Sequence, residues 1–155
     1  MAPTAPDYDE IVRVVQLYAD SFNAREGGPV NGPDPVRVDM LKEAFHEDAW
    51  IFFTEPDGTL RRHLISESFA EWAGPGEPAS PRITGRIISV TQAGDVASVL
   101  LGFDSSRGEQ FSWVDFHSLL RLNGVWKITN KTATHATRAG WAADRSAGRQ
   151  ETTVA

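Results

Sequence analysis

The dipeptide Asn123-Gly124 separates two segments of alternating apolar and polar residues, and it constrains the fold more than any other feature. Asn-Gly is a preferred sequence for the two-residue turn of a β-hairpin, because such turns need a positive φ at both positions. The turn also fixes the strand register, so we expect Leu122 to face Val125, with the pairing continuing outward. The sequence therefore predicts a long antiparallel hairpin built from residues 110–122 and 125–135.

Paired residues share a face, and in this register one face is apolar beside the turn and polar at its far end. The apolar end carries Leu119, Trp126 and Ile128, and the polar end carries Asp115, His117, Asn130 and Thr132, with Trp113 next to them. A face that packs entirely beneath helices should be uniformly apolar, so the polar end indicates a cavity lined by hydrogen-bonding groups. The alternative is that this end faces water, where the same side chains would be solvated and idle.

Asp115 and His117 stand two positions apart on one strand and should therefore lie side by side on this face. A carboxylate beside an imidazole raises its basicity and fixes its tautomer, as a general acid or base requires. Asn130, expected directly across from His117, would orient the imidazole or donate a hydrogen bond to a developing oxyanion. The alternative for His117 is a histidine that is satisfied by Asp115 and takes part in no chemistry.

The rest of the chain predicts an α+β domain. Helical spacing predicts three helices: residues 7–24, opened by a capping box of Asp7 and Glu10; residues 34–48; and a short one capped by Ser66. Alternation predicts a hairpin of residues 49–54 and 59–63, and a four-strand antiparallel meander of residues 82–92, 96–104, 110–122 and 125–135. The core should include Ile11, Val15, Tyr18, Leu41, Phe45, Leu119, Trp126 and Ile128.

Composition excludes several kinds of chemistry. The 155 residues include no cysteine, which excludes disulfides, thiolate metal sites and cysteine nucleophiles. The four histidines have no metal-ligand spacing, so we predict neither a metal nor another cofactor. A formal net charge of −6 disfavours nucleic acid and anionic membranes as partners. No apolar run approaches the roughly 20 residues that span a bilayer, and the N-terminus has no signal-peptide pattern, so we expect a cytoplasmic protein.

The segment from Trp113 to Lys131, WVDFHSLLRLNGVWKITNK, resembles the C-terminal strands of the nuclear transport factor 2-like superfamily, in its SnoaL-like and lumazine-binding branch. Residues 14–24 and the sequence AFHEDA at 44–49 are similar to the opening of the same superfamily. The resemblance implies a cone-shaped roll in which three N-terminal helices pack on a curved, mostly antiparallel sheet. It implies one domain over residues 7–137, and we expect residues 138–155 to form a flexible tail.

The resemblance also bears on single residues. Tyr18 ends a segment, VVQLY, that is similar to the part of ketosteroid isomerase holding its oxyanion-hole tyrosine, so Tyr18 would be a donor inside the cone. The alternative is an ordinary core residue with its hydroxyl at the rim. Phe53 stands where that isomerase has its general-base aspartate, which argues against steroid isomerisation by the same mechanism. We expect His63 to share a face with Trp50, as a second acid-base group or as an exposed strand-end residue.

These observations lead to two functional hypotheses, because this fold hosts isomerases, dehydratases, cyclases and binding proteins alike. The first is a cofactor-independent acid-base enzyme of the isomerase, lyase or cyclase type that acts on a small, mostly apolar metabolite, polyketide-like or heteroaromatic. The alternative is a non-catalytic small-molecule-binding protein. The candidate catalytic residues are His117, Asp115, Tyr18 and Asn130, and the candidate substrate-binding residues are Trp113, Trp50, His63, Phe22, Thr132 and Trp72.

We also expect a homodimer. The opposite face of the hairpin carries apolar side chains that would otherwise leave a large patch in water. These side chains are Val114, Phe116, Leu120 and Val125, with Lys127 and Lys131 expected at the rim of the interface.

Overall fold

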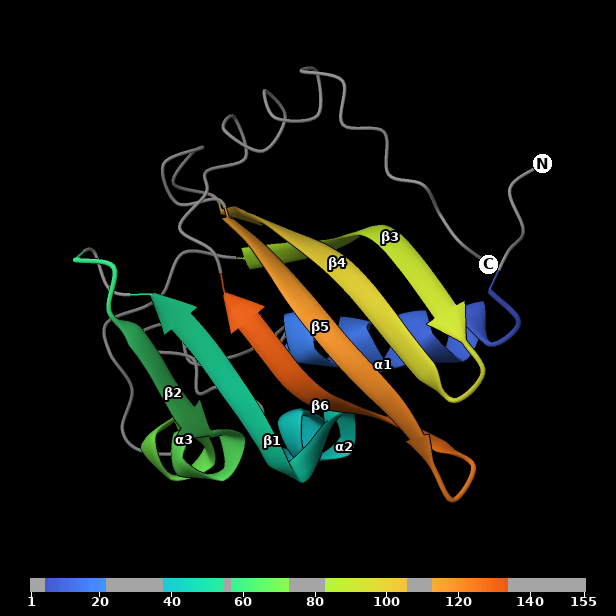
Figure 1. Ribbon diagram of the computed structural model, residues 1–155, viewed down its shortest axis with the longest axis horizontal. Helices are drawn as coiled ribbons and strands as arrows, with labels where there is room; N and C mark the ends of the chain where they lie inside the picture. Colours follow the sequence, from blue (N-terminus) through green and yellow to red (C-terminus); the bar gives the residue numbers. More distant parts are fainter. Residues whose placement is uncertain (1–4, 22–37, 55–56, 73–82, 106–112, 134–155) are drawn as a thin grey trace, which may run out of the picture.

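The computed structural model describes residues 5–21, 38–54, 57–72, 83–105 and 113–133. Within these residues, six strands form one twisted sheet in the order β2-β1-β6-β5-β4-β3 (Figure 1). The strands are β1 (Phe45–Thr54), β2 (Leu60–Leu64), β3 (Ile83–Ala93), β4 (Val96–Ser105), β5 (Trp113–Leu122) and β6 (Val125–Ala133). Strands β3 to β6 form the predicted antiparallel meander, and β1 pairs antiparallel with β2. The parallel pairing of β1 with β6 joins the two units and has no local signal in the sequence.

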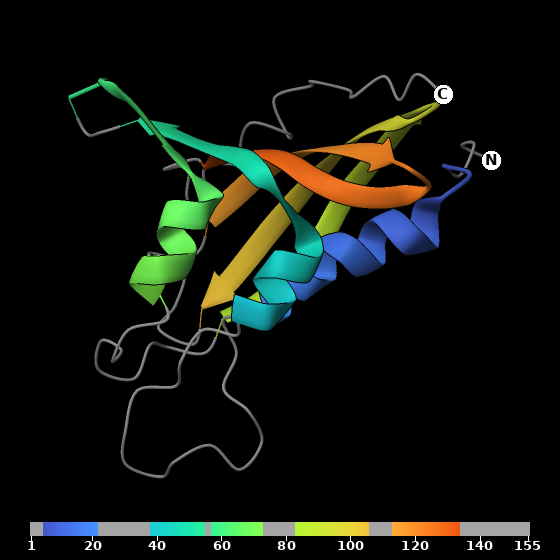
Figure 2. The ribbon, with the colours of Figure 1, turned by 90° about the horizontal axis from the view of Figure 1, so that it is seen from below.

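Three helices occur in the described residues: α1 (Tyr8–Asp20), α2 (Val38–Ala44) and α3 (Ile65–Trp72). All three lie on the same side of the sheet (Figure 2), and we call the sheet face that they cover the inner face. The third helix follows the β1–β2 hairpin, as the predicted order of elements has it, so the description of all three helices as N-terminal is not confirmed. Some predicted elements lie partly outside the described residues, namely where they include residues 22–24, 34–37, 82, 110–112 and 134–135. The predicted tail, residues 138–155, lies wholly outside them.

The second helix ends earlier than its periodicity predicts. Residues 45–48 belong to β1, because Phe45 pairs with Ile128 of β6. Phe45 is buried in the core as the first residue of β1, and its four-residue spacing from Leu41 also fits a helix, so spacing alone could not place the boundary. The long-range pairing with β6 decides the boundary.

Asp7 precedes α1 but does not form the expected capping box, since its side chain makes no capping hydrogen bond. Its Oδ2 atom instead accepts hydrogen bonds from Gln92, Arg121 and Trp126, all distant in sequence. Glu10 forms an ion pair with Arg13. The carboxylate that the local pattern assigns to the helix terminus therefore fastens α1 to the end of the sheet.

The predicted core is confirmed. All eight residues named from the sequence are at most 2% exposed. The helix α1 packs closely on β3 at Gly85, where an added Cβ atom would lie 2.3 Å from the Cβ of Ala19. A glycine is therefore needed at this crossing for steric reasons.

A β-bulge interrupts the β5–β6 hairpin. From the turn outward, pairing follows the expected register as far as Leu119 opposite Ile128. The next pair is Ser118 with Asn130, so β6 contains one additional residue, Thr129, at this point. Because side chains alternate between faces, one additional residue exchanges the inward and outward positions over the rest of β6.

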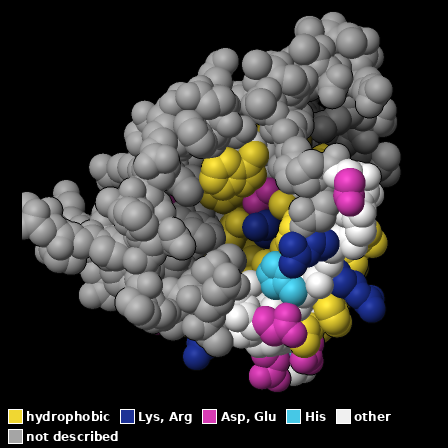
Figure 3. Space-filling model, turned by 90° about the vertical axis from the view of Figure 1, so that its left-hand side faces the viewer, with side chains coloured by type: hydrophobic (Ala, Val, Ile, Leu, Met, Phe, Trp, Pro, Cys, Tyr) yellow, Lys and Arg dark blue, Asp and Glu magenta, His cyan; other side chains and the backbone are white. Residues whose placement is uncertain are grey.

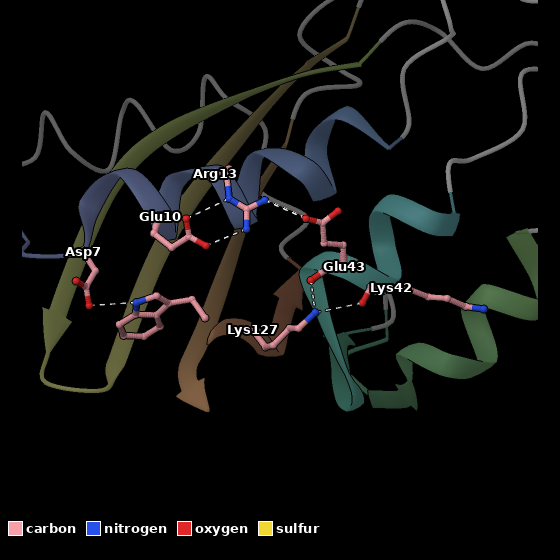
Figure 4. Close-up of polar contacts among 7 residues, drawn as sticks. Asp7, Glu10, Arg13, Lys42, Glu43 and Lys127 are labelled. Carbon is pink, nitrogen blue, oxygen red and sulfur yellow. Dashed lines mark hydrogen bonds and ion pairs between the residues drawn. The ribbon is translucent and has the colours of Figure 1, made fainter. Parts of the chain in front are cut away.

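Lys127, which the sequence places at the rim of a dimer interface, makes contacts within its own chain. Its ammonium group donates hydrogen bonds to the main-chain carbonyls of Lys42 and Glu43 (Figure 4). On the outer face Phe116 and Val125 are about half exposed, whereas Val114 is buried. No helix in the described residues is long and apolar enough to cross a membrane.

Candidate functional site

Four polar side chains meet beneath α1 on the inner face. Tyr18 comes from α1, Asp115 and His117 from β5, and Lys131 from β6. The Tyr18 hydroxyl donates to Asp115 Oδ2 at 3.3 Å, and Lys131 Nζ donates to the Tyr18 hydroxyl at 2.7 Å. Lys131 Nζ also lies 3.4 Å from Asp115 Oδ2. The structure thus brings together three of the predicted catalytic residues and adds Lys131, which the expected register assigns to the opposite face.

These side chains lie in the protein interior. Asp115 and His117 are 0% exposed, Tyr18 is 2% exposed and Lys131 is 9% exposed. A buried ion pair is a poor source of stability, because the desolvation of both charges offsets their mutual attraction. The arrangement is therefore difficult to explain as a device that only stabilises the fold.

Three buried polar atoms at this site have no hydrogen-bond partner among the described residues: Asp115 Oδ1 and both ring nitrogens of His117. The expected hydrogen bond between Asp115 and His117 is therefore absent from the described contacts. Most buried polar groups in native proteins are satisfied, so each exception requires an explanation. A bound molecule that supplies the missing partners is one such explanation.

Burial shifts the protonation equilibria of the site. Burial, assisted by the charge of Lys131, lowers the pKa of His117 well below its usual value, so this imidazole is neutral near pH 7. Burial raises the pKa of Asp115, while Lys131 acts in the opposite direction. Burial would by itself lower the pKa of Lys131, but Tyr18 and Asp115 raise it above the ordinary value, so the ammonium remains charged.

Aromatic rings surround the polar groups. The ring of Tyr18 makes edge contacts with Phe45 and Phe103, at centroid distances of 5.3 and 5.7 Å, and lies 5.1 Å from the His117 ring. Trp113 stacks on Phe103 at 4.8 Å. The wall around the site is thus largely apolar, as the sequence-based hypothesis of an apolar ligand requires.

The bulge corrects the predicted positions of two residues. Lys131 pairs with His117 and lies on the inner face, in the place expected for Asn130. Asn130 and Thr132 lie on the outer face, where the Thr132 hydroxyl donates to Asn130 Oδ1. Lys131 is the functional candidate that sequence reasoning missed. The residue that shifts the register is a threonine with no glycine beside it, so no local signal indicated the bulge.

The first hairpin also differs from the prediction. His63 pairs with Ile51 on the inner face, whereas Trp50 pairs with Leu64 and Asn130 on the outer face. Trp50 is therefore separated from the site, and its ring lies under the guanidinium of Arg62 at 5.0 Å. Phe22 and the side chain of Trp72 lie outside the described residues.

Figure 3 shows the β2 end of the molecule, with a hollow in which an acidic and a basic side chain lie beside hydrophobic ones, and with a histidine and further basic side chains at its rim. In the described part of the chain, no group of three His, Asp or Glu side chains is arranged to hold a metal ion.

Comparison with known proteins relates the chain to a family and to a fold. A family model described as "Putative lumazine-binding" matches residues 30–133. An NTF2-like protein of unknown function from Shewanella baltica OS155 is 23% identical, with a TM-score of 0.66, and the match covers 86% of this chain and 96% of that chain. An NTF2-like protein of unknown function from Methylobacillus flagellatus KT is 24% identical, with a TM-score of 0.63 and coverage of 86% and 94%.

At these identities the likeness to solved structures establishes the fold alone. No curated protein matches the chain.

Proposed function

Because the chain belongs to the lumazine-binding branch of the nuclear transport factor 2-like superfamily, we propose that its inner-face site binds a small, neutral, mostly apolar heteroaromatic molecule and moves a proton on it. The observation that carries this proposal is the set of three unpartnered polar atoms, on Asp115 and His117, among the described residues. They lie beside a charged lysine in an otherwise apolar environment. A ligand with both hydrogen-bond donors and acceptors along one edge would satisfy them.

The charges of the site favour a ligand without net charge. Lys131 carries one positive charge, and its proximity favours the ionised form of Asp115. The pair is then neutral as a whole, and His117 adds no charge near pH 7. A charged group placed between them would be desolvated without a free counterion, which is costly in the interior of a protein.

Asp115 is better suited than His117 to accept the proton. Burial and Lys131 both lower the basicity of His117, whereas burial raises the pKa of Asp115 and so makes its carboxylate a stronger base. The free Oδ1 atom would take a proton from an acidic C–H or N–H bond of the ligand. The electron pair of that bond would move to a ligand carbonyl oxygen, and return of the proton at another atom would complete an isomerisation.

Lys131 and His117 would stabilise the oxyanion formed in this step. Lys131 uses two of its three ammonium protons in its contacts with Tyr18 and Asp115, which leaves one for the ligand. The neutral imidazole of His117 supplies one N–H donor. Tyr18 donates its own proton to Asp115, so its role here is to hold Asp115 and Lys131 in position.

The alternative function is binding without catalysis. The specific observation in its favour is that hydrogen bonds from a ligand would satisfy all three unpartnered atoms without any proton transfer. The two functions share a binding site and differ in whether bound ligand exchanges protons with Asp115. An experiment must therefore measure binding and exchange separately.

A suitable probe is 6,7,8-trimethyllumazine, which is neutral, fluorescent and acidic at its 7-methyl group, because the resulting anion is delocalised onto a carbonyl oxygen. Fluorescence titration measures binding, and proton NMR in D2O measures exchange of the 7-methyl protons for deuterium. We expect the wild-type protein to bind the probe and to accelerate exchange. Asp115→Asn should retain binding within about tenfold and lose the acceleration.

The outcomes separate the two hypotheses. Binding without faster exchange in the wild-type protein would support the non-catalytic alternative. Equal acceleration by the wild-type protein and Asp115→Asn would assign the proton transfer to another group. Absence of binding would contradict both functions for this ligand class. His46→Asn, a change at a partly exposed histidine on β1 whose contacts among the described residues are with Asp48 alone, is the control that should change neither measurement.

A further inference from the structure

One row of side chains crosses the inner face from the buried site to the edge strand β2. The strand pairings place His117 of β5 next to Lys131 of β6, Lys131 next to Ile51 of β1, and Ile51 next to His63 of β2. His117 and His63 are separated by three strand spacings of about 4.8 Å each, or about 14 Å along the sheet. His63 therefore lies on the same face as the site, three strands away from its deepest residue.

Two contacts hold the imidazole of His63 in place. Its Nε2 atom lies 2.7 Å from the hydroxyl of Ser68, a residue of α3 that is 2% exposed. Its ring meets the ring of Phe53, on β1, edge to face at a centroid distance of 5.8 Å. No contact among the described residues engages the other ring nitrogen, Nδ1. The side chain is thus oriented by two elements and keeps one polar atom for a ligand.

The hydrogen-bonding role of Nδ1 depends on the Ser68 hydroxyl. If this hydroxyl donates to Nε2, Nδ1 carries the ring proton and is a donor, and if Nε2 donates to the hydroxyl, Nδ1 is an acceptor. A hydroxyl group on a ligand can pair with either form of the ring, because it both donates and accepts. A hydroxyl also carries no charge, which agrees with the uncharged ligand that the pair of Asp115 and Lys131 favours.

The two ends of the row face one hollow. Figure 3 shows a histidine at the rim of the hollow in which an acidic and a basic side chain lie beside hydrophobic ones. Of the two residues between His117 and His63 in the row, Lys131 has its ammonium turned to Tyr18 and Asp115, and Ile51 is apolar. A ligand that spans the row would therefore find polar partners at its two ends and an apolar surface near His63.

We propose that the ligand bears a short aliphatic chain that ends in a hydroxyl group and reaches from its ring to Nδ1 of His63. This inference rests on the proposed function, since it assumes that the ring occupies the deep site. The separation of about 14 Å includes a hydrogen bond of about 3 Å at each end. A bicyclic ring fills most of the remainder, so a chain of a few atoms beside Ile51 completes the span.

The test compares two neutral ligands that differ only in the hydroxyl group, 6,7-dimethyl-8-propyllumazine and 6,7-dimethyl-8-(3-hydroxypropyl)lumazine. Fluorescence titration gives the Kd of each. We expect the wild-type protein to bind the hydroxylated ligand about fivefold more tightly, as one additional neutral hydrogen bond provides. His63→Leu should abolish this preference. His46→Leu is the matched control and should retain it, because His46 contacts only Asp48 among the described residues.

Two further measurements identify the cause of the preference. Ser68→Ala should reduce it, because the imidazole of His63 then loses the contact that orients it. Raising the salt concentration should leave it unchanged, because the hydroxyl group carries no charge. A full preference in Ser68→Ala would contradict the orienting role of Ser68, and a preference that disappears in salt would contradict a hydrogen bond to a neutral group.

The outcomes also separate this inference from the proposed function. Equal binding of the two ligands by the wild-type protein would overturn the inference while leaving the proposed function intact. Loss of the preference to the same extent in His63→Leu and His46→Leu would also overturn it, because no specific contact would then account for the effect. If neither ligand binds, the proposed function fails and the inference fails with it.

Discussion

Replacing His117 by leucine should make the protein more stable and remove its ligand binding. His117 is 0% exposed, and neither ring nitrogen has a hydrogen-bond partner among the described residues. Leucine is similar in size, prefers an apolar environment and leaves no polar atom unsatisfied. The expected effect is therefore opposite in sign to that of most substitutions in a protein core, which are destabilising.

The magnitude follows from the two unsatisfied nitrogens. Each buried polar group without a partner costs about 1–3 kcal/mol, so the pair destabilises the fold by about 2–6 kcal/mol relative to an apolar side chain of the same shape. Imperfect packing of leucine in a site shaped for imidazole should reduce this gain in stability by about 1–2 kcal/mol. We expect a net gain of about 2 kcal/mol in the free energy of unfolding, which raises Tm by about 4–8 °C for a chain of this length.

Urea denaturation followed by tryptophan fluorescence, with thermal melts in parallel, measures this gain in the absence of ligand. His63→Leu is the matched control, because His63 has a partner in the hydroxyl of Ser68. That substitution leaves the buried hydroxyl of Ser68 without its partner and should destabilise the protein by about 1–2 kcal/mol. A loss of stability in His117→Leu similar to that in His63→Leu would refute the reasoning, since it would mean that the imidazole of His117 is satisfied in the folded protein.

Three further predictions concern pH, packing and assembly. The folded state of the wild-type protein resists protonation of His117, whose pKa is lowered by burial and by Lys131, whereas the unfolded state accepts that proton below about pH 6.5. The free energy of unfolding should therefore fall as the pH decreases from 6.5 to 5, by up to about 1.4 kcal/mol per pH unit. His117→Leu should lack this contribution when denaturation is measured at each pH. The same pH dependence of stability in the two proteins would contradict the prediction. Gly85→Ala should destabilise the protein by about 1–3 kcal/mol, because the new methyl group would lie 2.3 Å from the Cβ of Ala19, and the double variant with Ala19→Gly should recover most of the loss in the same assay. If the protein forms the homodimer expected from the sequence, sedimentation velocity should show a dimer for the wild-type protein. Phe116→Glu, a change at an exposed phenylalanine of the outer face, should give a monomer. A monomeric wild-type protein would refute this expectation.

Local patterns in the sequence determined the elements and the core. Helical spacing identified the buried face of α1, and the positive φ of Asn123 and Gly124 matches the turn inferred from the dipeptide. Alternation over the last four strands predicted the antiparallel meander, and the eight core residues named from it and from the helices are all buried. These features depend on neighbours within a few residues or across a tight turn, and such neighbours are visible in the sequence.

The candidate site was only partly predictable for the same reason. Tyr18, Asp115 and His117 follow from spacing and from resemblance, and they do meet. The inward position of Lys131 depends on a bulge that the sequence does not mark. Once the register shifts by one residue, Asn130 and Lys131 exchange faces, although nothing in their own identity has changed.

The sequence by itself determined the kind and order of the helices and strands, the eight named core residues, and the tight turn that joins β5 to β6, because these properties follow from local conformational preference and hydrophobic periodicity. Only the tertiary structure decided that Asp7 fastens α1 to the sheet, that β1 pairs with β6, and that a lysine rather than an asparagine faces His117. Each of these outcomes depends on contacts between segments about 80 or more residues apart in sequence, or on one additional residue in a strand. Such contacts are selected by the packing of the whole domain, which no local window of the sequence contains.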